Sequence, residues 1–234
     1  MELNGRKYLW DKILFAFVLL LAAFVLLGSP LFEVREIVVT GNRQLPAAKI
    51  VELSGIVPGT NIFKQNLREA QGRICPLPLV KEVVICRDFP SRIVINVRER
   101  QPLALLPTPG GFVQVDREGV CLQEGGVNDS FPVITGFPVS PLAPGEVVRD
   151  ERLRATLQVV DRFPETLLKE LSEVHINGQG QLVLYTLEGV ECRLGNASNL
   201  EQKLALLQQI LRQVRDRRIA YIDLSGVPVV KYAR

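Results

Sequence analysis

A long apolar run from Ile13 to Phe32 constrains this 234-residue chain more than any other feature. The run has no ionisable side chain, and an α-helix of roughly 20 residues crosses a bilayer core about 30 Å thick. Because lipid offers no hydrogen-bond partner to a bare backbone, the segment must be helical wherever it enters a membrane. We therefore predict a transmembrane helix over residues 13–32, which includes Leu20 and Leu27.

Two other interpretations of this run stay open. The densest part, Ile13–Leu27, is near the upper length of the apolar region of a cleaved signal peptide. Against cleavage, no small-x-small site follows the run, and Pro30 and Phe32 occupy the positions where cleavage would occur. The third interpretation is a helix buried in a soluble core.

The flanking charges predict the orientation of the helix. Arg6, Lys7 and Lys12 precede the run, and basic residues favour the cytoplasmic side of a membrane. We expect residues 1–12 to form a cytoplasmic tail and the long portion after the helix to lie outside the cell membrane, giving a single-pass topology.

The counts of charged residues and of cysteines argue against some classes of function. With 28 basic and 25 acidic residues the net charge is +3, too balanced to predict a nucleic-acid surface. The four cysteines, Cys75, Cys86, Cys121 and Cys192, form no C-x-x-C pair, which argues against zinc and thioredoxin-like sites. A disulfide is open in an oxidising compartment. For Cys86 and Cys192, which lie in alternating apolar segments, we predict buried free thiols.

Residues 33–102 predict a compact β-α-α-β-β unit. Period-two alternation marks the strands, and the helices have Pro or Asn at their start and Gly or Pro after their end. The elements are a strand Val34–Thr40, helices that begin after Pro46 and Asn66, and strands Val80–Arg87 and Ile93–Arg98. The Pro- and Gly-rich segment Gln101–Gly111 predicts a joint between domains.

Residues 103–234 predict a second domain, a mixed and mostly antiparallel sheet with two helices, so the expected fold class is α+β. Short strands alternate with Gly- and Pro-containing turns. The last two strands are Ile219–Leu224 and Val227–Tyr232, joined at Ser225-Gly226. The apolar faces of the two helices are Leu153, Leu157, Val160 and Phe163, and Leu200, Leu204, Leu207, Leu211 and Val214.

No pattern for catalysis emerges from the sequence. The single histidine, His175, lies in a predicted strand, and Leu224-Ser225-Gly226 lacks the first glycine of a nucleophile elbow. Asp116, Glu118 and Glu124 are close together, but carboxylates in turns are mostly solvated. We expect no enzyme activity, cofactor, metal or small-molecule substrate.

Seven short motifs follow one another along the chain: Val38–Asn42, Arg87–Pro90, Ile93–Val97, Glu99–Pro102, Val115–Val120, Pro132–Gly136 and Tyr221–Leu224. The first resembles the opening of a POTRA domain, and the next three resemble the close of that domain in the FtsQ/DivIB family of bacterial cell-division proteins. The last three resemble motifs of that family's second, β-rich domain. Each motif is short, but the ordered series covers nearly the whole chain.

The resemblance implies a POTRA domain at residues 33–102 and a β domain at residues 103–234, both outside the cell membrane. It implies a non-enzymatic scaffold of the divisome at the division septum, with FtsB/DivIC-like and FtsL-like division proteins as partners. This sequence departs from the family at Ser225, because the family usually has a basic residue after Asp-Leu. Any contact that the basic residue makes in other family members is therefore in doubt here.

The last predicted strand supplies a mechanism for partner binding. An edge strand presents unpaired N–H and C=O groups, to which a partner strand can add. Pro228 fits an edge because it has no N–H to donate, and Tyr232 is the best single anchor because aromatic residues dominate interfaces. The alternative is an ordinary edge, protected by Lys231 and Pro228. The predicted partner-binding residues are Ser225, Gly226, Val227, Val229, Val230, Lys231 and Tyr232.

A POTRA-bearing component of a transport or surface-assembly system is the second functional hypothesis. Such factors resemble outer-membrane insertion proteins, with several POTRA repeats and a β-barrel of long alternating strands. This sequence has one such unit and a helical anchor, which favours the division scaffold.

Overall fold

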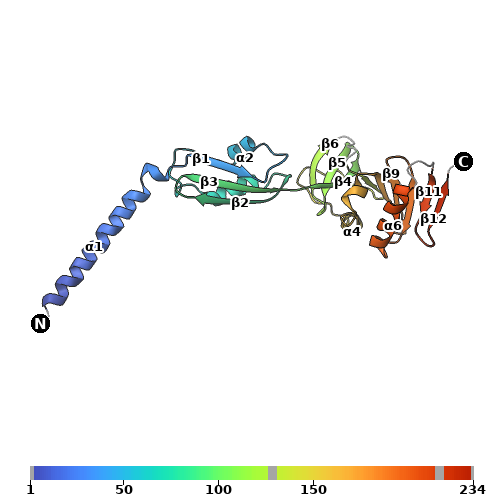
Figure 1. Cartoon of the computed structure of the whole chain (residues 1–234). Coiled ribbons are helices and arrows are strands. Elements are labelled where there is room, and N and C mark those ends of the chain that lie inside the picture. Colours follow the sequence, from blue (N-terminus) through green and yellow to red (C-terminus); the bar gives the residue numbers. More distant parts are fainter. Residues whose placement is uncertain (1–2, 126–130, 214–218, 233–234) are drawn as a thin grey trace. The chain divides into compact units, whose positions relative to one another are not determined.

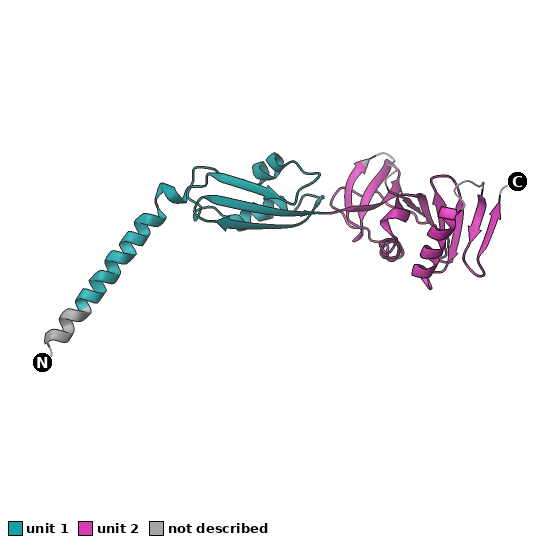
Figure 2. Cartoon of the chain, viewed as in Figure 1, with its two compact units in different colours: residues 1–99 teal, residues 100–234 magenta. Residues whose placement is uncertain are grey.

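The computed structural model describes residues 3–125, 131–213 and 219–232, with side chains from Trp10 onward. The chain divides into two compact units, residues 1–99 and 100–234 (Figure 2). Each unit has its own hydrophobic core. The helices and strands are labelled in Figure 1 and confirm the predicted α+β class.

The apolar run forms most of the first helix, α1 (Leu3–Leu27). Its window Trp10–Leu27 has a mean hydropathy of 2.3, and none of that window is buried within the protein. The helix extends further toward the N-terminus than the predicted span, residues 13–32, and stops short of its C-terminal end. The helix begins at Leu3 and ends at Leu27, because Gly28 is a poor helix former and Pro30 disfavours the helical conformation in the residue before it.

Phe32, which we predicted to lie in the transmembrane helix, belongs instead to the short 3₁₀ helix η1 (Pro30–Phe32). Its ring packs against the core of the first unit. The chain therefore leaves the apolar helix and enters the folded unit within a few residues.

The rest of the first unit has the predicted β-α-α-β-β order. It consists of β1 (Glu36–Thr40), α2 (Ala47–Ser54), α3 (Leu67–Ile74), β2 (Val80–Asp88) and β3 (Arg92–Glu99). The sheet order is β1-β3-β2, with β1 parallel and β2 antiparallel to β3. Both helices supply residues to the single core of this unit.

Strand alternation in this three-stranded sheet corrects one of the cysteine predictions. Val83 on β2 is buried, whereas Val84 is 50% exposed and Cys86 is also exposed. Residues 83–86 are all apolar or weakly polar. The sequence therefore does not show which alternate residues of the strand, 83 and 85 or 84 and 86, face the helices. Cys86 is a free but exposed thiol, while Cys192 in the second unit is free and buried as predicted.

Two residues close the first unit at the turn after β1. Gly41 has φ of +80°, and a Cβ there would lie 2.2 Å from the carbonyl oxygen of Val97, so the position requires glycine. The Glu99 carboxylate accepts the backbone N–H groups of residues 43, 44 and 45 at 2.8–2.9 Å. Burial raises the pKa of Glu99, but these hydrogen bonds outweigh burial and hold that pKa below its usual value.

The second unit is built on one nine-stranded sheet with the order β12-β11-β10-β9-β8-β7-β4-β5-β6. Five neighbouring pairs are antiparallel and three are parallel, which confirms the mixed, mostly antiparallel sheet. The strands are β4 (Pro102–Thr108), β5 (Gly111–Asp116), β6 (Cys121–Gly125), β7 (Val133–Thr135), β8 (Leu171–Ile176), β9 (Leu182–Thr186), β10 (Glu191–Gly195), β11 (Ile219–Asp223) and β12 (Val229–Tyr232).

The predicted joint at Gln101–Gly111 is wrong, because most of it is the interior strand β4. Leu103–Leu106 are buried, and β4 pairs with β5 on one side and β7 on the other. Pro102 stands at the first position of the strand, where a missing N–H is tolerated. The two units divide between Glu99 and Arg100.

Among the described residues of the second unit, three helices pack on this sheet, one more than predicted. They are α4 (Glu151–Val160), α5 (Glu165–Leu168) and α6 (Leu200–Gln213). The extra helix, α5, is a single turn that begins after Pro164. The predicted apolar faces of α4 and α6 pack on the core, Leu211 only partly, and Val214 lies outside the described residues.

A buried ion pair lies at the start of the second unit. Arg100 Nη1 is 2.6 Å from Asp116 Oδ2 and 2.7 Å from Glu118 Oε2. The Asp116 side chain is 3% exposed and also accepts the backbone N–H groups of Glu118 and Val120, each at 2.9 Å. Two of the three clustered carboxylates therefore fix the β5–β6 turn.

Candidate partner-binding edge

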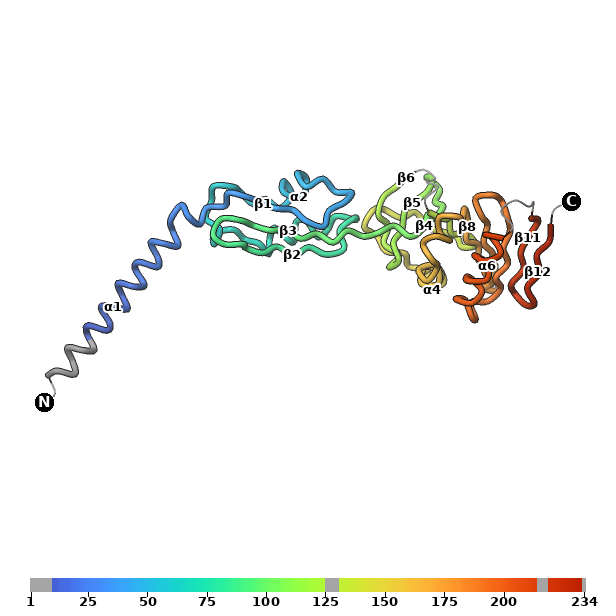
Figure 3. Tube along the Cα trace, viewed as in Figure 1, coloured from blue at the N-terminus to red at the C-terminus, as the bar shows by residue number. Residues whose placement is uncertain are grey.

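The last strand, β12, forms one edge of the nine-stranded sheet (Figure 3). It pairs antiparallel with β11, Val229 opposite Asp223 and Lys231 opposite Tyr221. Among the described residues, no strand lies on its outer side. We predicted that Pro228 lies inside a strand Val227–Tyr232, but the strand begins at Val229 and Pro228 directly precedes it.

The turn between β11 and β12 is held by short polar contacts. Ser225 donates its hydroxyl to Asp223 Oδ1 at 2.6 Å and its backbone N–H to the same oxygen at 2.9 Å. Both contacts lower the pKa of Asp223, and the hydrogen bond from the Ser225 hydroxyl has the larger effect. Ser225 therefore shapes this turn through both its hydroxyl and its backbone N–H.

The strand places its side chains on two different faces. Val230 packs partly against the core, so Val229 and Lys231 point to the opposite, open face. On that face the ring of Tyr221 lies between two cations. The ammonium of Lys231 is 5.5 Å from the ring centre, and the guanidinium carbon of Arg193 is 4.7 Å from it. Alternation puts Tyr232, which is 45% exposed, on the side of Val230.

The hairpin also exposes apolar side chains at its tip. Val227 is 85% exposed and Val229 is 48% exposed. Exposed apolar residues beside an open strand edge are a feature that stable monomers usually avoid, because such an edge invites pairing with another chain. The structure thus brings the seven predicted partner-binding residues together on one hairpin.

Of the other edge strands, β6, β2 and β1, the first two are less suited to strand addition. The start of β6 is covered, because Cys121 exchanges backbone hydrogen bonds of 2.8 Å with Gly145 and Glu146. In the first unit, β2 is also an edge, but Lys81, Glu82, Arg87 and Asp88 put four charges on nine residues. Charges on an edge strand oppose pairing with another strand. β12 has one charged residue, Lys231.

His175, the single histidine of the sequence, lies in a hydrogen-bonded cluster on the sheet. His175 Nδ1 lies 2.7 Å from Thr135 Oγ1 and 3.7 Å from Glu173 Oε1, with the side chain 37% exposed. A strand hydroxyl and carboxylate beside a histidine nitrogen make a surface hydrogen-bond cluster. Within the described ranges, no three His, Cys, Asp or Glu side chains are placed to hold a metal ion.

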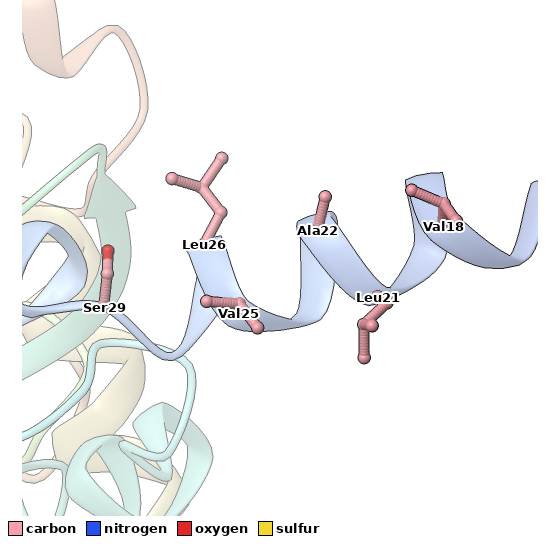
Figure 4. A pocket seen from close by; sticks show the side chains of 6 residues that line it. All are labelled: Val18, Leu21, Ala22, Val25, Leu26 and Ser29. Atoms are coloured by element: carbon pink, nitrogen blue, oxygen red, sulfur yellow. The ribbon is translucent and has the colours of Figure 1, made fainter. Parts of the chain in front are cut away.

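A shallow groove runs along α1 and is lined by Val18, Leu21, Ala22, Val25, Leu26 and Ser29 (Figure 4). The lining is almost wholly apolar and belongs to the helix predicted to span a membrane. It offers none of the convergent polar groups that orient a small ligand. We assign it to the surface of the apolar helix.

An apolar N-terminal helix, a β-α-α-β-β unit and a mixed sheet with an open C-terminal edge together define a POTRA-bearing protein with a second β domain. The family model described as the FtsQ-type POTRA domain matches residues 32–100. The model described as the C-terminal part of cell division protein FtsQ/DivIB matches residues 104–225. The chain belongs to the FtsQ/DivIB family of bacterial cell-division proteins.

Individual relatives agree with this assignment. Cell division protein FtsQ of Syntrophotalea carbinolica is 31% identical over 212 residues, which cover 87% of this chain and 74% of the relative. Cell division protein DivIB of Bacillus cytotoxicus is 26% identical over 98% of this chain and 87% of the relative. The solved extracytoplasmic domain of DivIB from Geobacillus stearothermophilus is 18% identical, with a TM-score of 0.38. The match covers 50% of this chain and 95% of the solved domain, and the likeness is too distant to carry an argument.

Proposed function

We propose that the protein is a non-enzymatic, membrane-anchored scaffold of the bacterial divisome at the division septum. Membership of a cell-division family supports this role. The proposed partners are FtsB/DivIC-like and FtsL-like division proteins. The alternative role in transport or surface assembly gains no support from the match over residues 104–225, which is to a cell-division domain.

The observation that carries the proposal is the open edge of β12. A partner strand that added there would gain main-chain hydrogen bonds, each with a net value of about 1 kcal/mol. The exposed side chains of Val227, Val229 and Tyr232 would add apolar contacts and selectivity. Tyr232 stays our choice of anchor residue, since truncating a buried aromatic at an interface can cost about 2 kcal/mol or more.

A pair of matched substitutions tests the edge. Val229→Asp should weaken capture of the FtsB/DivIC-like partner by about tenfold or more, because strand addition would bury an unpaired carboxylate. Val84→Asp on the sheet of the first unit is the control, since the two valines are 48% and 50% exposed and lie in edge strands. Binding can be measured by titrating the partner's extracytoplasmic segment onto the full-length protein. A weaker complex with Val84→Asp alone would move the site to the POTRA domain.

The proposed topology puts both folded units outside the cytoplasm. A membrane-impermeant thiol reagent applied to spheroplasts should then label Cys75 and Cys86, which are exposed. Cys121 and Cys192 should react only after denaturation, because they are buried and burial raises the pKa of the Cys192 thiol to about 12.

The N-terminus supplies the reciprocal measurement. In a Cys75→Ser, Cys86→Ser background, Glu2→Cys should be labelled only after lysis. Labelling of that cysteine in intact spheroplasts, with protection of Cys75 and Cys86 in the parent protein, would reverse the topology. Mass spectrometry of the labelled protein also reports whether the apolar helix is retained.

A further inference from the structure

The end of α1 and the adjoining face of the first unit form a cluster of three phenylalanines. The rings of Phe32 and Phe63 lie 5.3 Å apart between centroids, and those of Phe63 and Phe89 lie 5.4 Å apart and stacked. Phe63 is 43% exposed and Phe89 is 57% exposed, and Leu31, which precedes Phe32 in the sequence, is 48% exposed. The core uses only part of this apolar surface.

The cluster is tied directly to the last turn of the apolar helix. Asn61 donates its side-chain amide to the carbonyl oxygen of Leu27 at 2.7 Å, and its Oδ1 accepts the backbone N–H of Phe63 at 2.9 Å. Ile62 donates its N–H to the Phe32 carbonyl at 2.7 Å. Asn61 therefore links the final residue of α1 to the residue that exposes the central ring.

The third ring is held at the same end of the sheet. Phe89 lies in the turn between β2 and β3, and Arg35 donates its backbone N–H to Ser91 in that turn at 2.8 Å. The chain reaches Arg35 only a few residues after α1 ends at Leu27. The exposed rings and the end of the helix are thus parts of one small region.

We propose that Phe63 and Phe89 insert into the lipid interface of the leaflet in which α1 ends. The lipid surface is the occupant because this region is continuous with the apolar window that ends at Leu27. The interfacial layer is about 5–8 Å thick on each side of the hydrocarbon core. The Cα of Phe63 is at most about 7.6 Å from that of Asn61, which contacts the helix end.

This chemistry suits an interface. Phenylalanine and leucine side chains of surface-bound segments bury themselves at the boundary between headgroups and acyl chains. Lys64, next to Phe63, is exposed and can face lipid phosphates. In this arrangement the first unit is held at the membrane by its loops as well as by α1. The inference rests on the proposed membrane anchor and adds a second contact with the bilayer.

Depth-dependent fluorescence quenching tests the contact on the full chain. Trp10 is the only tryptophan, so a Trp10→Phe background can carry a single probe, Phe63→Trp or Phe89→Trp. In phosphatidylethanolamine–phosphatidylglycerol vesicles with lipids brominated high on the acyl chain, we expect both probes to lose at least half of their emission. Val84→Trp is the control, because Val84 is exposed but lies about 16 Å along the strand from Phe89.

Each outcome separates the possibilities. If neither Phe63→Trp nor Phe89→Trp is quenched more than Val84→Trp, the rings do not contact lipid and the inference is wrong. If the probes are shielded from aqueous iodide but not quenched by brominated lipid, a second copy of the chain covers them, which also overturns it. The parent protein, with Trp10 in α1, reports helix insertion separately, so failure of the anchor itself is distinguishable.

Discussion

Deleting residues 227–234 is expected to reduce capture of the FtsB/DivIC-like partner to background, a loss of at least about 100-fold, or about 2.7 kcal/mol. The deletion removes β12 and the exposed Val227 and Tyr232, and with them the open edge to which a partner strand would add. Binding to the full-length protein in detergent or nanodiscs, measured by titration with the partner's extracytoplasmic segment, gives the result directly.

The controls decide what such a loss means. Because Val230 packs partly on the core, the deletion also removes some packing, and circular dichroism must show an intact fold. Should the deleted protein unfold, Val229→Asp tests the same edge without removing the strand. A folded deletion protein with unchanged affinity would exclude β12 as the site.

Arg100→Ala is expected to destabilise the second unit by about 3 kcal/mol. Removing the guanidinium leaves the Asp116 carboxylate, with its side chain 3% exposed, without its cation, and breaking one partner of a buried ion pair costs about 3–5 kcal/mol. The two backbone N–H groups that Asp116 keeps argue for the lower end of that range. Urea unfolding followed by circular dichroism measures the free energy of unfolding.

A neighbouring arginine provides the matched control. Arg98 pairs with Glu82 at 2.6 Å, but the two side chains are 65% and 52% exposed, so Arg98→Ala should cost at most about 1 kcal/mol. Adding Asp116→Asn to Arg100→Ala should recover part of the lost stability, because no buried charge is then left unpaired. Equal effects of Arg98→Ala and Arg100→Ala would contradict this account.

Local pattern was sufficient for most of the elements. The period-two alternation of Ile93, Ile95 and Val97 predicted an inward face that the structure buries. Helices α2, α3, α4 and α6 follow apolar stripes that the sequence displays. Local pattern failed at β4, a buried strand that contains two prolines. Pro102 and Pro107 indicated a joint between domains, and only the pairing with β5 and β7 identifies the segment as a strand.

Some features of the candidate site could likewise be predicted from the sequence, and others could not. The sequence by itself determined a long apolar helix, a final strand after the Ser225-Gly226 turn, and the apolar residues of that strand, because these depend on composition and spacing along the chain. Only the tertiary structure decided that β12 pairs, among the described strands, with β11 alone, that Val229 and Lys231 face outward, and that Phe63 and Phe89 meet beside the end of α1. Those features depend on which strands pair and which face the helices cover, and such contacts join residues far apart in sequence.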